Sequence, residues 1–181
     1  MSVLKIARMG HPILAGRAAR VENPASVEVR RLVDDMIETM ADANAAGLAA
    51  PQVFRPVRLV IFHVPAGRAG PGADAVPLTV LINPEIIALD AEVQSAYEGC
   101  LSLPGMVGRV PRLARVRYRG VGLDGEVIDR IAEGFHARVV QHECDHLDGV
   151  LYPRRMPDLS HFGFAEEIRA RLNGAQTVEE D

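Results

Sequence analysis

The stretch GFHARVVQHECDHL, residues 134–147, has the apolar spacing of an amphipathic helix and ends in two histidines with a glutamate between them. Successive helical residues are about 100° apart, so His142 and His146 differ by about 40° around the axis and can hold one ion between them. Glu143 projects about 100° from His142, where it meets a water on that ion without displacing it. Two neutral imidazoles and a free carboxylate are the groups that a hydrolytic metal site needs. On this pattern alone, a surface helix that carries these residues by chance remains an equal alternative.

A metal site of this kind requires a third ligand, and the position of that ligand separates classes of hydrolase. Upstream, Cys100 follows Gly99, which allows a sharp turn, and a thiolate beside a cation is a strong ligand. Downstream, His161 lacks the glycine-spaced extension that places a third ligand in zinc endopeptidases. We therefore expect Cys100 to be the third ligand. Cys144 points about 200° away from His142 and is expected to be a buried apolar residue.

Two other functions remain open at this point. A zinc endopeptidase would use a downstream ligand, so its metal content would survive Cys100→Ala. In a non-catalytic module the metal would only tie the helix to the segment near Cys100. Glu143 would then have no role, and Glu143→Gln would have no effect.

The composition indicates one globular domain over residues 1–181. The chain is 48% hydrophobic and carries 20 Lys+Arg against 24 Asp+Glu, and the resulting net charge of −4 argues against unspecific binding to nucleic acid or anionic membranes. Two cysteines cannot form a disulfide framework, which indicates a reducing compartment. The sequence has no apolar run of about 18 residues that could span a membrane. The first 21 residues are basic but almost lack serine, and we expect mature structure there rather than a transit peptide.

The order of the predicted elements favours an α+β fold over a doubly wound sheet. Apolar residues at helical spacing from Val29 to Met40 predict a helix before the strands, and Ile168 with Leu172 suggests a short helix near the end. Strands are predicted at residues 58–63, 79–82, 92–97 and 114–119. Asp124-Gly125 predicts a hairpin between residues 121–123 and 126–128.

Three further segments are expected to be irregular. Residues 47–52 contain small residues and a proline, which favours a loop or an edge segment that another backbone can approach closely. Residues 65–77 contain three glycines and three prolines and are expected to form a surface loop. Residues from about 174 to 181 are expected to be a frayed tail.

Three segments together resemble the motifs of the peptide deformylase family. They are Gly47-Leu48-Ala49-Ala50-Pro51-Gln52, Glu98-Gly99-Cys100-Leu101-Ser102 and Gln141-His142-Glu143-Cys144-Asp145-His146-Leu147-Asp148-Gly149. The segment Gly10-His11-Pro12-Ile13-Leu14 is also similar, so the resemblance runs from about residue 4 to about residue 152. One departure is Ala45, which stands where the family usually has the first glycine of G-x-G-L-A-A-P-Q. We expect this alanine to affect specificity more than the reaction.

The resemblance implies an α+β fold in which mixed or antiparallel strands pack around a central metal-bearing helix. It implies a metal ion held by Cys100, His142 and His146, with Fe(II) as the usual ion and nickel, cobalt or zinc able to substitute. Ligand chemistry alone would suit zinc equally well. The implied enzyme removes the N-formyl group from the N-terminal formyl-methionine of newly synthesised polypeptides and releases formate.

The resemblance also implies roles for three further groups. Glu143 would take a proton from the attacking water and later deliver it to the leaving amine. The Gln52 side-chain amide and the backbone N–H of Leu101 would donate hydrogen bonds to the developing oxyanion. Without the adjoining motif, Gln52 would instead be interpreted as a loop residue bonded to its own backbone.

Substrate binding is expected at Gly47, Phe135 and Val139. Phe135 and Val139 lie on the same helix face as the histidines and form either an apolar pocket for the methionine side chain or only part of the core. The implied partners are N-formyl-methionyl nascent peptides, with transient contact to the ribosome and no membrane or specific nucleic acid. The implied location is the cytoplasm.

A further carboxylate on the helix is expected to act indirectly. Asp145 lies about 60° from His142, on the side opposite Glu143. We predict that it orients a ligand or pairs with an arginine such as Arg112.

Overall fold

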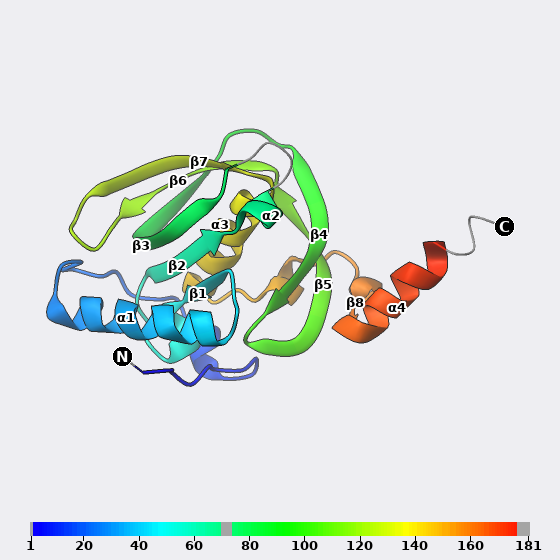
Figure 1. Cartoon of the computed structure of the whole chain (residues 1–181), viewed down its shortest axis with the longest axis horizontal. Coiled ribbons are helices and arrows are strands. Elements are labelled where there is room, and N and C mark those ends of the chain that lie inside the picture. Colours follow the sequence, from blue (N-terminus) through cyan, green and yellow to red (C-terminus); the bar gives the residue numbers. More distant parts are fainter. Residues whose placement is uncertain (1, 70–73, 177–181) are drawn as a thin grey trace.

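The computed structural model describes residues 2–69 and 74–176 of the chain. Its strands form two antiparallel sheets, one in the order β1-β2-β3-β6-β7 and the other in the order β4-β5-β8 (Figure 1). The strands are β1 (Gly47–Ala49), β2 (Leu59–Val64), β3 (Val76–Ala88), β4 (Val93–Cys100), β5 (Leu103–Leu113), β6 (Arg115–Val121), β7 (Val127–Glu133) and β8 (Phe162–Phe164). The α-helices are α1 (Val27–Asp42), α2 (Ala66–Ala69), α3 (Gly134–Leu147) and α4 (Ala165–Gln176). The expected α+β fold with strands around a central helix is confirmed.

Strand β2 of the five-stranded sheet is buried on both faces. Along β2, Val60 and Phe62 belong to a core cluster with α3, whereas Leu59 and Ile61 belong to a second cluster with α1. Side chains alternate between the two faces of a strand, so a single run of apolar residues serves both cores. Figure 1 shows α3 in the middle of the molecule, between the two sheets. The helix with the histidines is therefore held from several sides.

The first helix begins and ends at local signals in the sequence. Ser26 caps α1, because its side chain accepts a hydrogen bond from the backbone N–H of Val29. After the helix, Asn44 adopts φ 48°, which turns the chain toward β1. The apolar stripe predicted from Val29 to Met40 lies inside this helix, as expected.

The central helix follows β7 without a linker and ends at a position that requires glycine. Gly149 has φ 69°, and a Cβ there would lie 2.5 Å from the carbonyl oxygen of Ala15. Only glycine can take this backbone conformation at such a close approach. The N-terminal segment then packs beside the end of α3, where the N–H of Ala18 donates to the carbonyl of Leu147 at 2.8 Å.

Strand β5 was not predicted from the sequence. Residues 103–113 include two glycines and two prolines, which weaken a strand prediction. In the structure β8 pairs only with Met106–Gly108 of β5. Pro104 and Pro111 lie outside that pairing, so the N–H groups that proline lacks are not needed for it. The short strand β8 was also missed.

The predictions for the remaining segments are partly corrected. Residues 47–52 form the edge strand β1 and a 3-10 turn, in agreement with an edge segment. The predicted loop at 65–77 contains α2 and the first residues of β3, while residues 70–73 of it lie outside the described part of the chain. Helix α4 continues to Gln176, past the predicted start of a frayed tail, and residues 177–181 are not described.

Helix α4 extends away from the two sheets in Figure 1. Ile168 is its buried apolar anchor, whereas Leu172 is exposed. Among the described residues, no helix combines the length and the apolar character needed to cross a bilayer.

Candidate metal centre

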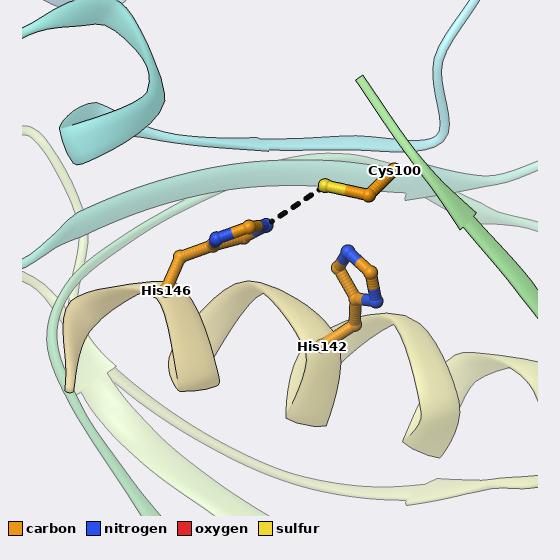
Figure 2. Close-up of side chains that lie close together, drawn as sticks. All are labelled: Cys100, His142 and His146. Atoms are coloured by element: carbon orange, nitrogen blue, oxygen red, sulfur yellow. Dashed lines mark hydrogen bonds between the residues drawn. The ribbon is translucent and has the colours of Figure 1, made fainter. Parts of the chain in front are cut away.

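Three ligand-type side chains converge at the centre of the molecule. One ligand atom from each of Cys100, His142 and His146 lies within 4.8 Å of the other two. The Cys100 Sγ lies 3.3 Å from His146 Nε2 (Figure 2). Figure 2 shows the two imidazoles on the side of α3 and the Cys100 side chain opposite them, with its sulfur pointing toward His146; Cys100 is the last residue of β4. The convergence predicted from helix angles and from the glycine turn is present.

Local structure brings the cysteine to this position. Cys100 is the last residue of β4, and the register between β4 and β5 shifts between Gly99 and Cys100. Such an irregularity re-aims a side chain at the end of a pairing. The shift carries the thiol toward the helix rather than along the sheet.

The first histidine is oriented by a buried carboxylate. His142 Nδ1 lies 2.8 Å from Glu98 Oε2, which leaves its Nε2 as the ligand atom. Arg112 donates two hydrogen bonds of 2.9 Å to the same carboxylate. Burial alone would raise the pKa of Glu98, but the hydrogen bonds from His142 and Arg112 outweigh it and lower the pKa to about 2. Glu98 is therefore ionised and holds the imidazole in one tautomer.

The pairing expected for Asp145 is confirmed. Arg112 donates through Nη1 to Asp145 Oδ2, so one guanidinium bridges Asp145 and Glu98. Arg155 makes two further hydrogen bonds to Asp145, at 2.7 and 3.1 Å. Asp145 thus acts on the site through Arg112 and not by direct contact.

Gln52 faces the thiol through its amide nitrogen. Its Oε1 accepts a hydrogen bond from the backbone N–H of Ala49 at 2.9 Å, which fixes the amide. Its Nε2 lies 3.4 Å from Cys100 Sγ and 3.2 Å from Ser102 Oγ. The oxygen is therefore bonded to the local backbone, as the loop interpretation expected, while the nitrogen donates to the Cys100 thiol and to the Ser102 hydroxyl. Leu101 lies in the turn after Cys100 and lines the same cavity.

Glu143 is buried beside the three ligand-type residues. Its Oε2 has no hydrogen-bond partner among the described residues. Burial raises the pKa of Glu143 to about 7. A Cβ at Gly47 would lie 2.4 Å from Glu143 Oε1, so glycine is needed there to leave room for the carboxylate. Gly47 therefore shapes the site next to the carboxylate as well as bordering the cavity.

A cavity of about 520 Å³ opens beside these residues. Cys100, His142 and Glu143 line it, together with the turn after β4. Phe135 and Val139, the residues expected to form an apolar pocket, also line it. Val139 also belongs to a core cluster and Phe135 packs against that cluster, so both residues are part of the core and border the cavity.

Two residues that contact the site were not identified from the sequence. Arg138 donates to Glu98 Oε1 at 2.7 Å, and the ring of Tyr152 stacks on His142 with centroids 6.2 Å apart. Arg138 precedes His142 by four residues, so helical spacing places both on one face and could have indicated the contact. For Tyr152, which follows the helix in a 3-10 turn, the sequence carries no such signal.

The donor set fits a divalent transition-metal ion. A thiolate with two imidazoles suits iron, zinc, cobalt or nickel and leaves room for a water ligand. Burial moves the pKa of His146 well below its usual value, so this ring is neutral, as a ligand must be. The downstream alternative is not supported: His161 lies 3.4 Å from the Tyr97 hydroxyl and is not part of the ligand cluster found among residues 2–69 and 74–176.

Comparison with known proteins points to one family. The family model described as polypeptide deformylase matches residues 3–161. "Peptide deformylase 1" of Nitrosomonas europaea is 48% identical over 176 residues, which cover 97% of this chain and 98% of the relative. "Peptide deformylase 2" of Bordetella bronchiseptica is 53% identical over 163 residues, with 90% and 93% covered. The structure of a class I type b peptide deformylase from Acinetobacter baumannii, with Met-Ala-Ser bound, superposes with a TM-score of 0.79 at 39% identity and covers 86% of this chain and 100% of that one.

Proposed function

The chain belongs to the polypeptide deformylase family, whose metal-dependent members remove the N-formyl group from newly made polypeptides, and we propose that Cys100, His142 and His146 hold the metal ion for this reaction. The observation that carries the proposal is the convergence of one thiol and two imidazoles within 4.8 Å beside a cavity. We further propose Fe(II) as the ion, with nickel, cobalt or zinc able to substitute. A bound ion of this kind would polarise the formyl carbonyl and lower the pKa of a water molecule.

Glu143 is the proposed general base. Its unpartnered Oε2 is free to accept a proton from water, and a pKa raised by burial to about 7 suits both acceptance and return of that proton. After attack on the formyl carbon, the same oxygen delivers the proton to the leaving amine. Formate and a free amino terminus are the products.

Gln52 and Leu101 are the proposed oxyanion donors. The Gln52 amide is fixed through its Oε1, so its Nε2 is already in place when negative charge develops on the formyl oxygen. The backbone N–H of Leu101, next to Cys100, is the second proposed donor. Losing one such donor typically costs about 3 kcal/mol of barrier stabilisation.

The methionine side chain is proposed to occupy the part of the cavity lined by Phe135 and Val139. Gly47, which also lines the cavity, permits close approach of the peptide backbone. The bound Met-Ala-Ser in the related enzyme from Acinetobacter baumannii supports a peptide with an N-terminal methionine as the ligand here. The substrate is therefore an N-formyl-methionyl nascent peptide.

The test is formate release from a formyl-methionyl peptide by anaerobically prepared iron or nickel protein. We expect Glu143→Gln to retain the metal and lose turnover by about 10²- to 10⁴-fold, because only the proton acceptor is removed. The matched control is Glu85→Gln, which changes an exposed glutamate on β3. Turnover that survives Glu143→Gln, or is absent from the metal-loaded wild type, would contradict the proposal.

We also propose that the enzyme works in the cytoplasm, with transient ribosome contact and without binding specific nucleic acid. The net charge of −4 argues against a broad RNA-binding surface, which supports a transient ribosome contact. Sedimentation of translating and idle ribosomes with the protein tests this. Salt-resistant binding to bare ribosomal RNA would contradict it.

A further inference from the structure

A cation lies at the rim of the substrate cavity. The Arg68 guanidinium, on the short helix α2, stands 4.0 Å from the centre of the Phe135 ring. Both residues line the cavity. A guanidinium over an aromatic face is attracted by the ring, so this contact limits the positions that the exposed Arg68 side chain takes.

The charge of Arg68 is not neutralised by the other described residues. Among the described residues, the charged side chains that line the cavity are Arg68, Glu98, Arg138 and Glu143. Arg138 and Glu98 pair with each other at 2.7 Å, and Glu143 lies at the proposed metal centre. Within residues 2–69 and 74–176, no carboxylate lies within ion-pair distance of Arg68. The rim therefore presents one available positive charge to whatever enters the cavity.

Arg68 at the rim lies where one particular residue of an extended peptide substrate would be expected. Phe135 precedes His142 by seven residues on α3, which corresponds to about 10 Å along the helix. The cavity is bordered by β1 and β4, and each of these is the edge strand of its sheet. Free backbone groups on edge strands favour an extended peptide between them.

In an extended peptide, side chains two residues apart point to the same side, about 7 Å from one another. When the methionine side chain enters the pocket at Val139 and Phe135, the side chain of the third residue therefore points to the same wall, about 7 Å away. Arg68 lies over the Phe135 ring of that wall.

We propose that Arg68 is a specificity-determining residue that favours formyl peptides with an acidic third residue. This inference rests on the proposed function, because it assumes that methionine occupies the Phe135 pocket. Glutamate or aspartate at the third position pairs with the guanidinium, a neutral residue does not, and lysine is repelled. The effect is modest and falls with salt, as for other exposed ion pairs.

The test compares kcat/KM for three amidated peptides, formyl-Met-Ala-Glu-Ala, formyl-Met-Ala-Gln-Ala and formyl-Met-Ala-Lys-Ala, so that no terminal carboxylate adds charge. We expect the order Glu above Gln above Lys, with about two- to fivefold between neighbours at low salt. Arg68→Ala should equalise the three peptides, and Arg68→Glu should invert the order. The matched control is Arg31→Ala, which removes an exposed arginine of α1 outside the cavity lining.

Equal rates for the three peptides with the wild type, or a preference that survives Arg68→Ala, would overturn this inference while leaving the proposed function intact. Absence of turnover for all three peptides would instead contradict the proposed function. The affinities of the corresponding peptides without the formyl group, measured at equilibrium, test the charge preference independently of turnover. The same order of affinities is expected there, and equal affinities would also overturn the inference.

Discussion

Two groups of arginines and carboxylates have similar hydrogen-bond lengths and opposite surroundings. We call inner network the residues Glu98, Arg112, Arg138 and Asp145, and outer cluster the residues Arg117, Arg119 and Asp129. In the inner network Arg112 and Glu98 are 2.9 Å apart and their side chains are only 5% and 4% exposed. In the outer cluster Arg117 and Asp129 are 2.6 Å apart, with 41% and 30% exposed. Distance alone would rank the outer pair higher.

Burial reverses that ranking. In the outer cluster water already solvates both charges, so the pair adds little to folding. In the inner network each charge has lost its water, and removing one partner leaves the others buried and unpaired. The inner network also holds His142 at 2.8 Å from Glu98, so its integrity decides the orientation of a proposed metal ligand. Substitutions in the two groups should therefore have different effects on stability and metal affinity, and both effects can be measured.

The largest effect is expected for Glu98→Gln. This change removes the charge that three donors, Arg112, Arg138 and His142, share. We expect a loss of about 3–5 kcal/mol in the free energy of unfolding and metal affinity weaker by about 10- to 100-fold. Urea denaturation and competition with a chelator measure the two quantities.

Glu85→Gln is the matched control, since it neutralises an exposed glutamate on β3. It should leave both quantities at wild-type values. A Glu98→Gln protein with wild-type stability and metal affinity would show that the inner network is dispensable.

An intermediate effect is expected for Asp145→Asn. Asp145 reaches the site only through Arg112, and Arg155 partly covers it from the solvent side. We expect about 1–3 kcal/mol of destabilisation and weaker metal retention, with turnover preserved in the metal-loaded enzyme. Unchanged metal affinity would count against a role for Asp145 in orienting the site.

The smallest effect is expected for Asp129→Asn in the outer cluster. Hydrogen bonds from Arg117 hold the pKa of Asp129 below its usual value, so its contribution is present above pH 3.8 and is lost as the pH falls further. At neutral pH we expect a melting temperature indistinguishable from that of the wild type, with unchanged metal content, as thermal scans and metal analysis can show. A loss comparable to that of Glu98→Gln would end the contrast between the two groups.

The sequence was sufficient to predict the arrangement of residues that lie on the same helix. Helical angles placed His142 beside His146, and Asp145 was expected to orient a ligand or to pair with an arginine such as Arg112. The convergence of the histidines and the pairing with Arg112 are both present in the structure. Glu98 lies two residues before Cys100 on β4, but the register shift between Gly99 and Cys100 means that the period of two alone does not direct both side chains to α3.

The sequence was insufficient where pairing between distant segments decides the result. Strand β5 was missed because its prolines and glycines weaken a strand prediction, and they are tolerated because Pro104 and Pro111 lie outside the three-residue pairing with β8. The stacking of Tyr152 on His142 depends on how the chain turns after α3, which no local pattern reports. The place of Arg68 at the cavity rim depends likewise on packing between α2 and Phe135.

The most direct test of the metal centre is anomalous X-ray diffraction from crystals of the anaerobically prepared iron or nickel protein. We predict a single strong peak bonded to Cys100 Sγ and to one nitrogen each of His142 and His146, with Glu143 close by and not bonded. A peak ligated by other side chains, or Cys100 several ångströms from the ion, would contradict the account.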